Sequence, residues 1–305
     1  MYEGAFRILR VLGDGKSRSR DALARDAGEG ASVVREVLER YPKWFEPEGN
    51  AVRCSERGLA ALAREMVARS AAQSPDAPWR EAYEALAASR GRPKRELDQV
   101  YVTTDTAIRR AELLLESGEH QRGLLFLGDD DLTSAAVQWA GAGRRVTVVD
   151  TDDDVLRVLR EGAEAHGWDL AAIEHDLRDP WDRAMTGRFG AVFTDPPYAV
   201  EGFALFVSRA IELLKPDGRL YVCFGHSRRA SERGLQKQRV LSDAGLLIES
   251  VFEGFNKYDG AESIGAQSAL WRCRVTPESK PIVTGRVDGP LYTSRPKPIS
   301  NSTSS

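Results

Sequence analysis

The chain has 305 residues, of which 42% are hydrophobic and 29% charged, so it is long enough and apolar enough to fold around a buried core. Its formal net charge of −3 argues against general binding to nucleic-acid backbones, and it has no run of about 18 apolar residues that would span a membrane. The three cysteines lie far apart and the four histidines show no metal-ligand spacing. We therefore expect a cytoplasmic protein with reduced thiols, no bound metal and no membrane partner.

Residues 1–70 are predicted to form a small winged-helix-like domain. Three helical stretches come first, the last of them at 32–41. A turn at 47–50 then separates two short strands, and a helix follows at 55–69. The helix at 32–41 balances two arginines with two glutamates, whereas a helix that reads DNA usually carries uncompensated positive charge. We therefore expect a dimerisation or lid module, and a homodimer formed through it.

The rest of the chain is predicted to contain a linker, a large α/β domain and a tail. The linker covers 71–97 and includes a helix at about 79–90. From 98 to 275, short apolar runs alternate with amphipathic stretches, which is typical of a parallel sheet covered by helices. The predicted strands are 124–127, 146–149, 170–173, 191–194, 219–224, 247–252 and 268–275, and the predicted helices 132–140, 153–166, 202–214 and 231–244. This order predicts a Rossmann-like, doubly wound domain of the class I methyltransferase type, followed by a flexible tail at 276–305.

The sequence Gly128-Asp129-Asp130-Asp131 lies between the first predicted strand of this domain and its helix. A phosphate-binding loop would have glycines here, because backbone amides must approach the phosphates. Three carboxylates instead suit a cationic ligand such as a sulfonium or an ammonium. Thr133 opens the following helix, whose free amides are available to one carboxylate of the ligand. The residues predicted to bind the donor here are Gly128, Asp129, Asp131 and Thr133.

Three further signals follow strand ends, where an open α/β sheet binds its ligands. Asp150 ends the second strand, where a carboxylate commonly binds both ribose hydroxyls of an adenosine ligand. Asp176 follows the third strand and is predicted to accept a hydrogen bond from the adenine amino group. Asp195-Pro196-Pro197-Tyr198 follows the fourth strand, and its prolines fix the backbone around the carboxylate and the ring.

These residues predict alkyl transfer from S-adenosylmethionine or its decarboxylated form. A sulfonium carbon is electrophilic and its thioether leaving group is neutral, so the site has to align a nucleophile and accept its proton. We expect Asp130 or Asp195 to be the base, and Tyr198 to lie over the cationic centre or the acceptor.

Four segments resemble the branched-chain polyamine synthase family, over residues 95–275. They are Asp98-Gln99-Val100-Tyr101-Val102-Thr103, then 126–134 around the three aspartates, then Asp195-Pro196-Pro197, and last Phe255-Asn256-Lys257-Tyr258. The resemblance implies aminopropyl transfer from decarboxylated S-adenosylmethionine to spermidine, dimerisation through the N-terminal module, and Asp130 as the residue that activates the acceptor. It also implies a set of substrate-binding residues, namely Asp98, Gln99, Tyr101, Asn256 and Tyr258.

The resemblance has departures, and they lead to our main hypothesis. The family often has a CxxC segment between its domains, but 71–97 has no cysteine, and the tail is rich in Ser, Thr and Pro instead of acidic residues. The catalytic core is also similar to that of isonocardicin synthase, which transfers the 3-amino-3-carboxypropyl group of S-adenosylmethionine to a phenol oxygen of a β-lactam antibiotic. We therefore hypothesise that reaction on a phenol or amine of a small molecule in secondary metabolism, with release of methylthioadenosine.

Three alternatives stay open from the sequence. The first is aminopropyl transfer to a polyamine, because three adjacent carboxylates also suit ammonium groups. The second is an amino-methyltransferase acting on a nucleic-acid base, which Asp195-Pro196-Pro197-Tyr198 and the winged helix would fit but the acidic balance does not favour. The third is a non-enzymatic regulator of the winged-helix type. A small-molecule acceptor is the expected partner, and nucleic acid is not.

Overall fold

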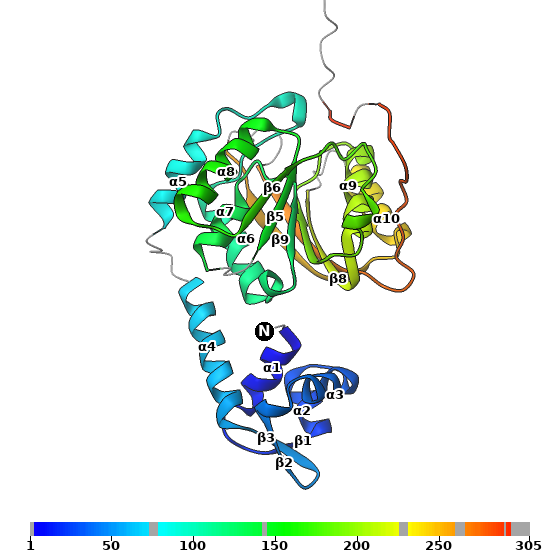
Figure 1. Ribbon diagram of the computed structural model, residues 1–305. Coiled ribbons are helices and arrows are strands. Elements are labelled where there is room, and N and C mark those ends of the chain that lie inside the picture. Colours follow the sequence, from blue (N-terminus) through cyan, green and yellow to red (C-terminus); the bar gives the residue numbers. More distant parts are fainter. Residues whose placement is uncertain are drawn as a thin grey trace, which may run out of the picture.

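The structure, a computed structural model, describes residues 3–72, 79–141, 145–225, 231–259, 266–289 and 291–293. They form a small N-terminal domain and a larger α/β domain, and the long helix α4 (Glu56–Ala72) leads from the first toward the second (Figure 1). Helix α4 contacts α6 (Thr104–Glu116) of the larger domain. Within the described part of the chain, no helix is long and apolar enough to cross a membrane.

The N-terminal domain packs three helices against a small antiparallel sheet. Its elements are α1 (Glu3–Leu12), β1 (Arg18–Ser19), α2 (Arg20–Ala27), α3 (Ala31–Arg40), β2 (Phe45–Glu48) and β3 (Ala51–Cys54), with the strand order β1-β3-β2. Buried Leu9, Leu23 and Val34 join the three helices in one core. The predicted helices and hairpin are present, and β1 is an addition. The winged-helix interpretation and the dimerisation role stay predictions.

The larger domain is built on a seven-stranded, mostly parallel sheet. Its strands are β4 (Leu124–Leu127), β5 (Val146–Asp150), β6 (Leu170–Glu174), β7 (Phe189–Thr194), β8 (Leu214–Phe224), β9 (Leu247–Lys257) and β10 (Gln267–Arg274). They lie in the order β6-β5-β4-β7-β8-β10-β9, and β10 is antiparallel to both of its neighbours. The Rossmann-like fold of the class I methyltransferase type, predicted from the sequence, is confirmed.

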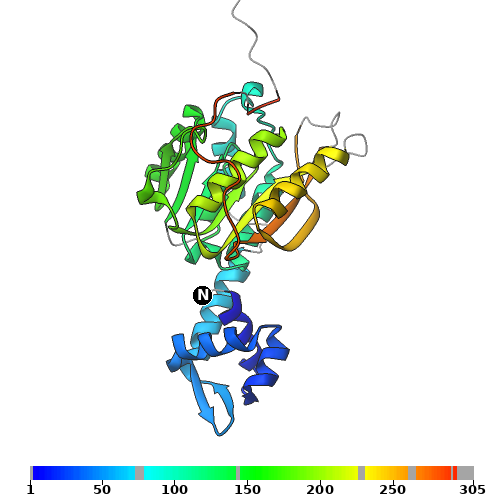
Figure 2. The ribbon, with the colours of Figure 1, turned by 90° about the vertical axis from the view of Figure 1, so that its right-hand side faces the viewer.

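Helices cover both faces of this sheet (Figures 1 and 2). One face carries α5 (Arg80–Ser89), α6, α7 (Thr133–Trp139) and α8 (Asp153–His166), and the other carries α9 (Val200–Leu213) and α10 (Ser231–Asp243). Helix α6 is missing from the sequence prediction. Its buried face includes Thr106 and Arg110, which interrupt the apolar spacing by which amphipathic helices are recognised.

The segment after β10 lies along the outside of α9. The backbone amides of Ile282 and Val283 donate hydrogen bonds to the Ser208 hydroxyl, and Leu291 is buried. Apolar side chains of this segment therefore cover α9, so the part described, which ends at residue 293, differs from the predicted flexible tail. Residues 294–305 lie outside the described residues.

Candidate active site

Two adjoining pockets open where β4, β5 and β7 end, the edge at which an open α/β sheet binds ligands. The Asp150 pocket is bounded by residues that follow these strands and by the C-terminal segment: Gly128, Val149, Asp150, Asp176, Leu177, Leu291 and Tyr292. The Lys237 pocket is bounded by Tyr198 after β7 and by residues in or next to α10 and the last three strands: Cys223, Phe224, Lys237, Tyr258 and Ser268. Asp98, Asp130, Asp195 and Pro196 line both pockets.

The three consecutive aspartates after β4 point in different directions. The backbone is in the left-handed region at Gly128 (φ 70°) and at Leu132 (φ 53°), so the loop makes a sharp bend before α7. The Asp129 carboxylate accepts a hydrogen bond from the Ser134 backbone amide (3.2 Å) and thus caps α7. Burial raises the pKa of Asp129 to about 8. The helix N-terminus, predicted to bind a ligand carboxylate, already has a carboxylate from the chain itself.

Asp131 faces the interior of the protein. Its carboxylate accepts hydrogen bonds from the Val102 backbone amide and from Arg110 Nη1, both at 2.7 Å. Thr133 is fully buried at the start of α7 and, like Asp129 and Asp131, lines neither pocket. The turn thus directs these three side chains away from both pockets, and their predicted contacts to the donor stay predictions.

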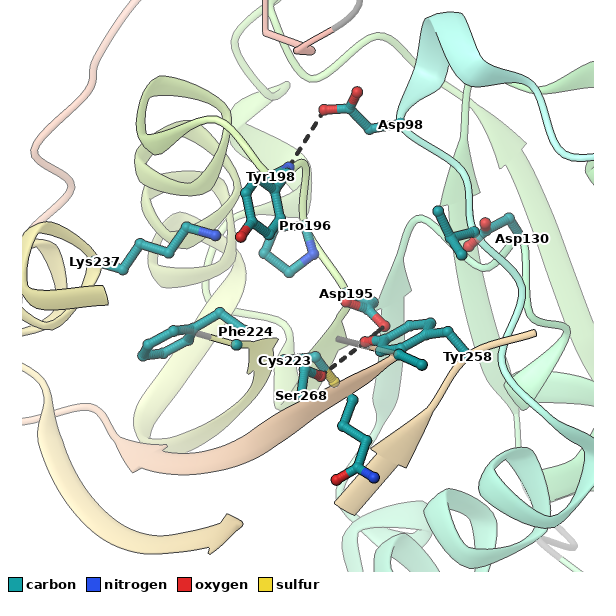
Figure 3. A pocket seen from close by; sticks show the side chains of 14 residues that line it. Asp98, Asp130, Asp195, Pro196, Tyr198, Cys223, Phe224, Lys237, Tyr258 and Ser268 are labelled. Carbon is teal, nitrogen blue, oxygen red and sulfur yellow. Dashed lines mark hydrogen bonds between the residues drawn. The ribbon is translucent and has the colours of Figure 1, made fainter. Parts of the chain in front are cut away.

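Asp130, between these two, is directed to the boundary of the pockets (Figure 3). No described residue makes a hydrogen bond to its carboxylate, while its backbone carbonyl accepts one from Arg90 Nη1 (2.9 Å). Tyr83 Oη donates to the neighbouring carbonyl of Asp131 (2.6 Å), so α5 holds the loop from behind. Burial, and then the charges of Asp131, Asp150 and Asp195, raise the pKa of Asp130 well above its ordinary value.

Asp195 belongs to a closed ring of hydrogen bonds. Its Oδ2 accepts from Arg110 Nη2 (2.6 Å) and from Tyr258 Oη (2.9 Å), and Tyr258 Oη also lies 2.8 Å from Ser268 Oγ. Asn256 closes the ring, because it donates to Ser268 Oγ (2.9 Å) and accepts from Arg110 Nε (2.8 Å). The ring holds the Asp195 carboxylate at the pocket floor and partly neutralises it.

Arg110 organises this ring but was missed by sequence reasoning. It is 1% exposed and balances both Asp131 and Asp195. An arginine inside an apolar helix face is the sequence signal that would have found it, because such a residue is seldom buried without carboxylate partners. Predicted Asn256 is buried in the ring and lines neither pocket, whereas predicted Tyr258 lines the Lys237 pocket.

Asp150, the last residue of β5, and Asp176, two residues after β6, both line the Asp150 pocket. Three backbone amides, those of Asp129, Thr151 and Asp152, donate to the Asp150 carboxylate at 2.7 to 2.9 Å and fix its direction. Burial raises the pKa of Asp150. The Asp176 carboxylate is paired with Arg178 instead of being free. Their contacts to ribose and adenine stay predictions.

Asp98 connects three parts of the chain at the mouth of the site. It adopts φ 54°, and its carboxylate accepts hydrogen bonds from the backbone amides of Thr293 (2.9 Å) and Tyr198 (3.3 Å). This contact fixes the C-terminal segment, from which Leu291 and Tyr292 line the Asp150 pocket. Sequence reasoning missed these two residues because they lie in a stretch without a recognisable pattern.

The other predicted residues near Asp98 have mainly structural contacts. Gln99 lines the Asp150 pocket, but its amide donates to Asp152 Oδ2 (2.7 Å) and accepts from the Lys94 backbone amide (2.8 Å). Tyr101 lies under the Arg90 guanidinium, 3.6 Å from it, and lines neither pocket. Of the residues predicted to bind substrate, Asp98, Gln99 and Tyr258 therefore lie at a pocket.

Lys237 is the one lysine or arginine among the described residues that line the second pocket, and it was not predicted. It is 3% exposed, and its Nζ lies 4.8 Å from the centre of the Tyr198 ring and 5.2 Å from that of Phe203. Burial lowers the pKa of Lys237 to about 8. Tyr198, predicted to act in catalysis, is 37% exposed and forms one side of this pocket.

The Asp150 pocket suits a nucleoside with a positive charge. Among the described residues that line it there is no lysine or arginine, the side chains that usually bind a phosphate, and His175 is the one basic side chain. Five aspartates line it beside apolar walls such as Val149 and Leu177. An adenosyl sulfonium combines an apolar base, ribose hydroxyls and a cation. The apolar walls suit the base, and the carboxylates suit the hydroxyls and the cation. No group of three metal-ligating side chains is found in the described part of the chain.

Comparisons with known proteins give consistent relatives. Residues 79–293 match the family described as the branched-chain polyamine synthase A C-terminal domain. The chain is 35% identical over 186 residues to N(4)-bis(aminopropyl)spermidine synthase of Thermus thermophilus, an alignment that covers 60% of this chain and 54% of that protein. It is 33% identical over 183 residues to the enzyme of the same name from Thermococcus kodakarensis, covering 58% and 52%. The chain thus spans about half the length of the curated relatives it matches.

A solved structure extends the similarity to both domains. The branched-chain polyamine synthase from Thermus thermophilus, crystallised with N4-aminopropylspermidine and 5′-methylthioadenosine, superposes with a TM-score of 0.64 at 26% identity. The superposition covers 95% of this chain and 91% of that one.

Proposed function

The chain belongs to the branched-chain polyamine synthase family, and from that premise we propose that it transfers an aminopropyl group from decarboxylated S-adenosylmethionine to an amine nitrogen of a small molecule. The names of the relatives, which are bis(aminopropyl)spermidine synthases, make a polyamine the first acceptor class to test. This proposal replaces our main hypothesis from the sequence. The relatives described above give no support to 3-amino-3-carboxypropyl transfer in antibiotic biosynthesis.

The electrostatics of the Asp150 pocket support the decarboxylated donor. A donor that kept its carboxylate would place a negative charge among five aspartates, of which Asp176 and Asp195 are paired with arginines. The backbone amide that would best receive that carboxylate, at the start of α7, is bonded to Asp129. Losing the carboxylate removes this repulsion and leaves an ammonium and a sulfonium, which the aspartates attract.

The observation that carries the proposal is the position of Asp130. Its carboxylate lies between the two pockets, makes no hydrogen bond within the described residues, and has a raised pKa. A free carboxylate with high proton affinity is suited to remove a proton from an attacking amine. Asp195 lies at the same boundary, but Arg110 and Tyr258 already bind one of its oxygens.

The reaction then balances without further reactants. The amine nitrogen attacks the propyl carbon next to sulfur, a C–N bond forms, and the C–S bond breaks. The electron pair of that bond stays on sulfur, which leaves as the neutral thioether of 5′-methylthioadenosine. The proton of the attacking nitrogen passes to the Asp130 carboxylate, while Asp195 faces the cationic centre.

The test is mass spectrometry of products made with each donor separately. Purified protein is incubated with S-adenosylmethionine or its decarboxylated form, together with spermidine, putrescine and a phenol. We expect products only with the decarboxylated donor and an amine. Products that carry the extra mass of a carboxyl group would contradict the proposal and restore the 3-amino-3-carboxypropyl hypothesis. Absence of methylthioadenosine release with either donor would refute alkyl transfer altogether.

A further inference from the structure

The Lys237 pocket has opposite charges at its two sides. Asp98, Asp130 and Asp195 lie where it meets the Asp150 pocket, and Lys237 enters the pocket from α10 on the other side (Figure 3). Tyr198 and Phe224 form apolar walls between the two sides. A pocket of this kind is complementary to a molecule with a positive end and a negative end.

Lys237 forms no ion pair with a carboxylate of the described residues. Burial lowers its pKa, and the charges of Asp195 and Asp98 oppose this only in part. Its side chain is almost fully buried, and its Nζ lies 4.8, 5.2 and 5.9 Å from the ring centres of Tyr198, Phe203 and Phe224. Buried lysines are rare unless they are paired, because removing the ammonium group from water is costly. Aromatic faces compensate only part of this cost.

The neighbourhood adds a second positive charge. Arg233 lies one turn before Lys237 on α10, and its guanidinium is 5.9 Å from the centre of the same Tyr198 ring. A polyamine that filled this pocket would bring one of its ammonium groups toward these two cations. The charge pattern therefore disfavours an ammonium group at the α10 side of the pocket, while the three aspartates favour one at the opposite side.

We propose that the acceptor is an amine that also carries a carboxylate, that the carboxylate is bound by Lys237, and that the amine faces Asp130. The inference rests on the proposed function, because it takes the Lys237 pocket to be the acceptor pocket. It assigns the negative charge to the acceptor and not to the donor, since Lys237 lines only the pocket away from Asp150. The pKa of Asp130 is raised and that of Lys237 is lowered, so burial disfavours the charged form of both side chains. An acceptor with its ammonium group at Asp130 and its carboxylate at Lys237 would stabilise both charges.

The experiment uses acceptor pairs that differ by one carboxylate, with decarboxylated S-adenosylmethionine as the donor. The pairs are L-ornithine with putrescine and L-lysine with cadaverine, and spermidine is the reference polyamine. We expect kcat/KM of the full-length protein to be higher for the carboxylated member of a pair. In Lys237→Met this kcat/KM falls roughly 10- to 100-fold, the range for a lost charge-assisted hydrogen bond, while that of the diamine stays equal or rises.

Two further variants separate charge from structure. Lys237→Arg keeps the positive charge and should keep the preference for the carboxylated acceptor. Lys215→Met removes an exposed lysine at the start of β8, the far end of that strand from the pocket, and should change neither acceptor. The preference of the wild-type protein between paired acceptors needs no variant, so poor folding of Lys237→Met would not remove the test.

The outcomes also separate this inference from the proposed function. Transfer to spermidine or putrescine without preference for ornithine or lysine would overturn the inference and leave aminopropyl transfer standing. An unchanged preference in Lys237→Met would overturn it as well. If no amine in the set is alkylated, both the inference and the proposed function fail.

Discussion

Asp130→Asn tests the role of the one carboxylate that lies free between the two pockets. The substitution keeps the size of the side chain and removes its ability to take up a proton. Since the Asp130 carboxylate has no hydrogen-bond partner within the described residues, no contact that holds the loop is lost. The change should therefore act on turnover and leave the fold in place.

The role and environment of Asp130 predict the size of the turnover loss and the direction of the stability change. Removing a general base usually lowers turnover by a factor of about 10² to 10⁴, which corresponds to roughly 3 to 5 kcal/mol of transition-state stabilisation. The free energy of unfolding, in contrast, should not fall in the variant. Because the pKa of Asp130 is higher in the folded protein than in the unfolded chain, the ionised form opposes folding above the unfolded value of about 3.9. The asparagine side chain never ionises, so the Asp130→Asn variant should be at least as stable as the wild type at neutral pH.

The assay is single-turnover release of methylthioadenosine at saturating donor, combined with calorimetric measurement of donor affinity. We expect a turnover loss of at least about a hundredfold with donor affinity changed by less than about threefold. For the wild type, kcat/KM should rise with pH through the raised pKa of Asp130, and this rise should disappear in the variant.

The neighbouring residue supplies the control. Asp129→Asn changes the same loop, but its side chain caps α7 and lines neither pocket, and asparagine caps helices about as well as aspartate. Its turnover should stay within a few fold of the wild type. If Asp130→Asn retained more than a tenth of wild-type turnover, or if both variants lost equal activity, the assignment of the base to Asp130 would be wrong.

Three other outcomes are expected. Arg110→Met leaves Asp131 buried without its cation and should lower the free energy of unfolding, measured in urea titrations, by about 3 to 5 kcal/mol. Adding Asp131→Asn should recover part of this loss. A loss below about 1 kcal/mol would refute the role of Arg110 as the shared counter-ion. Tyr292→Ala removes an aromatic wall of the Asp150 pocket and should weaken donor binding, measured by calorimetry, by about 1 kcal/mol, roughly fivefold in Kd. The kcat at saturating donor should stay nearly unchanged. A change confined to the KM of the acceptor would show that Tyr292 does not contact the donor. Burial lowers the pKa of Lys237 to about 8; the charges of Asp195 and Asp98 oppose this lowering and the charge of Arg233 adds to it. The ornithine-to-putrescine ratio of kcat/KM should therefore be highest below pH 8 and fall as the pH rises through that value. The ratio should stay flat in Lys237→Arg, and a flat ratio in the wild type would count against a charged Lys237.

Much of the α/β domain was predictable because its apolar runs are local signals. The predicted strand at 124–127 is β4, and the predicted helix at 153–166 is α8, with the same bounds. Helix α6 was not predicted, because its buried face carries polar side chains that bind residues distant in the sequence. The segment after β10 was also misjudged, since its packing depends on α9 and not on its own composition.

The sequence by itself determined that carboxylates gather at the ends of β4, β5 and β7, since parallel strands bring their carboxyl ends to one edge. It did not determine which of Asp129, Asp130 and Asp131 faces the ligand. That choice depends on the left-handed backbone at Gly128 and Leu132 and on the hydrogen bond from the Ser134 amide to Asp129. It also depends on Arg110 and Tyr83, which reach the loop from other helices and bind Asp131. The cation Lys237 likewise enters the site from α10 only through tertiary packing. Spacing along a chain predicts which residues reach an edge of a sheet, but the direction of each side chain is decided by the partners that the fold brings to it.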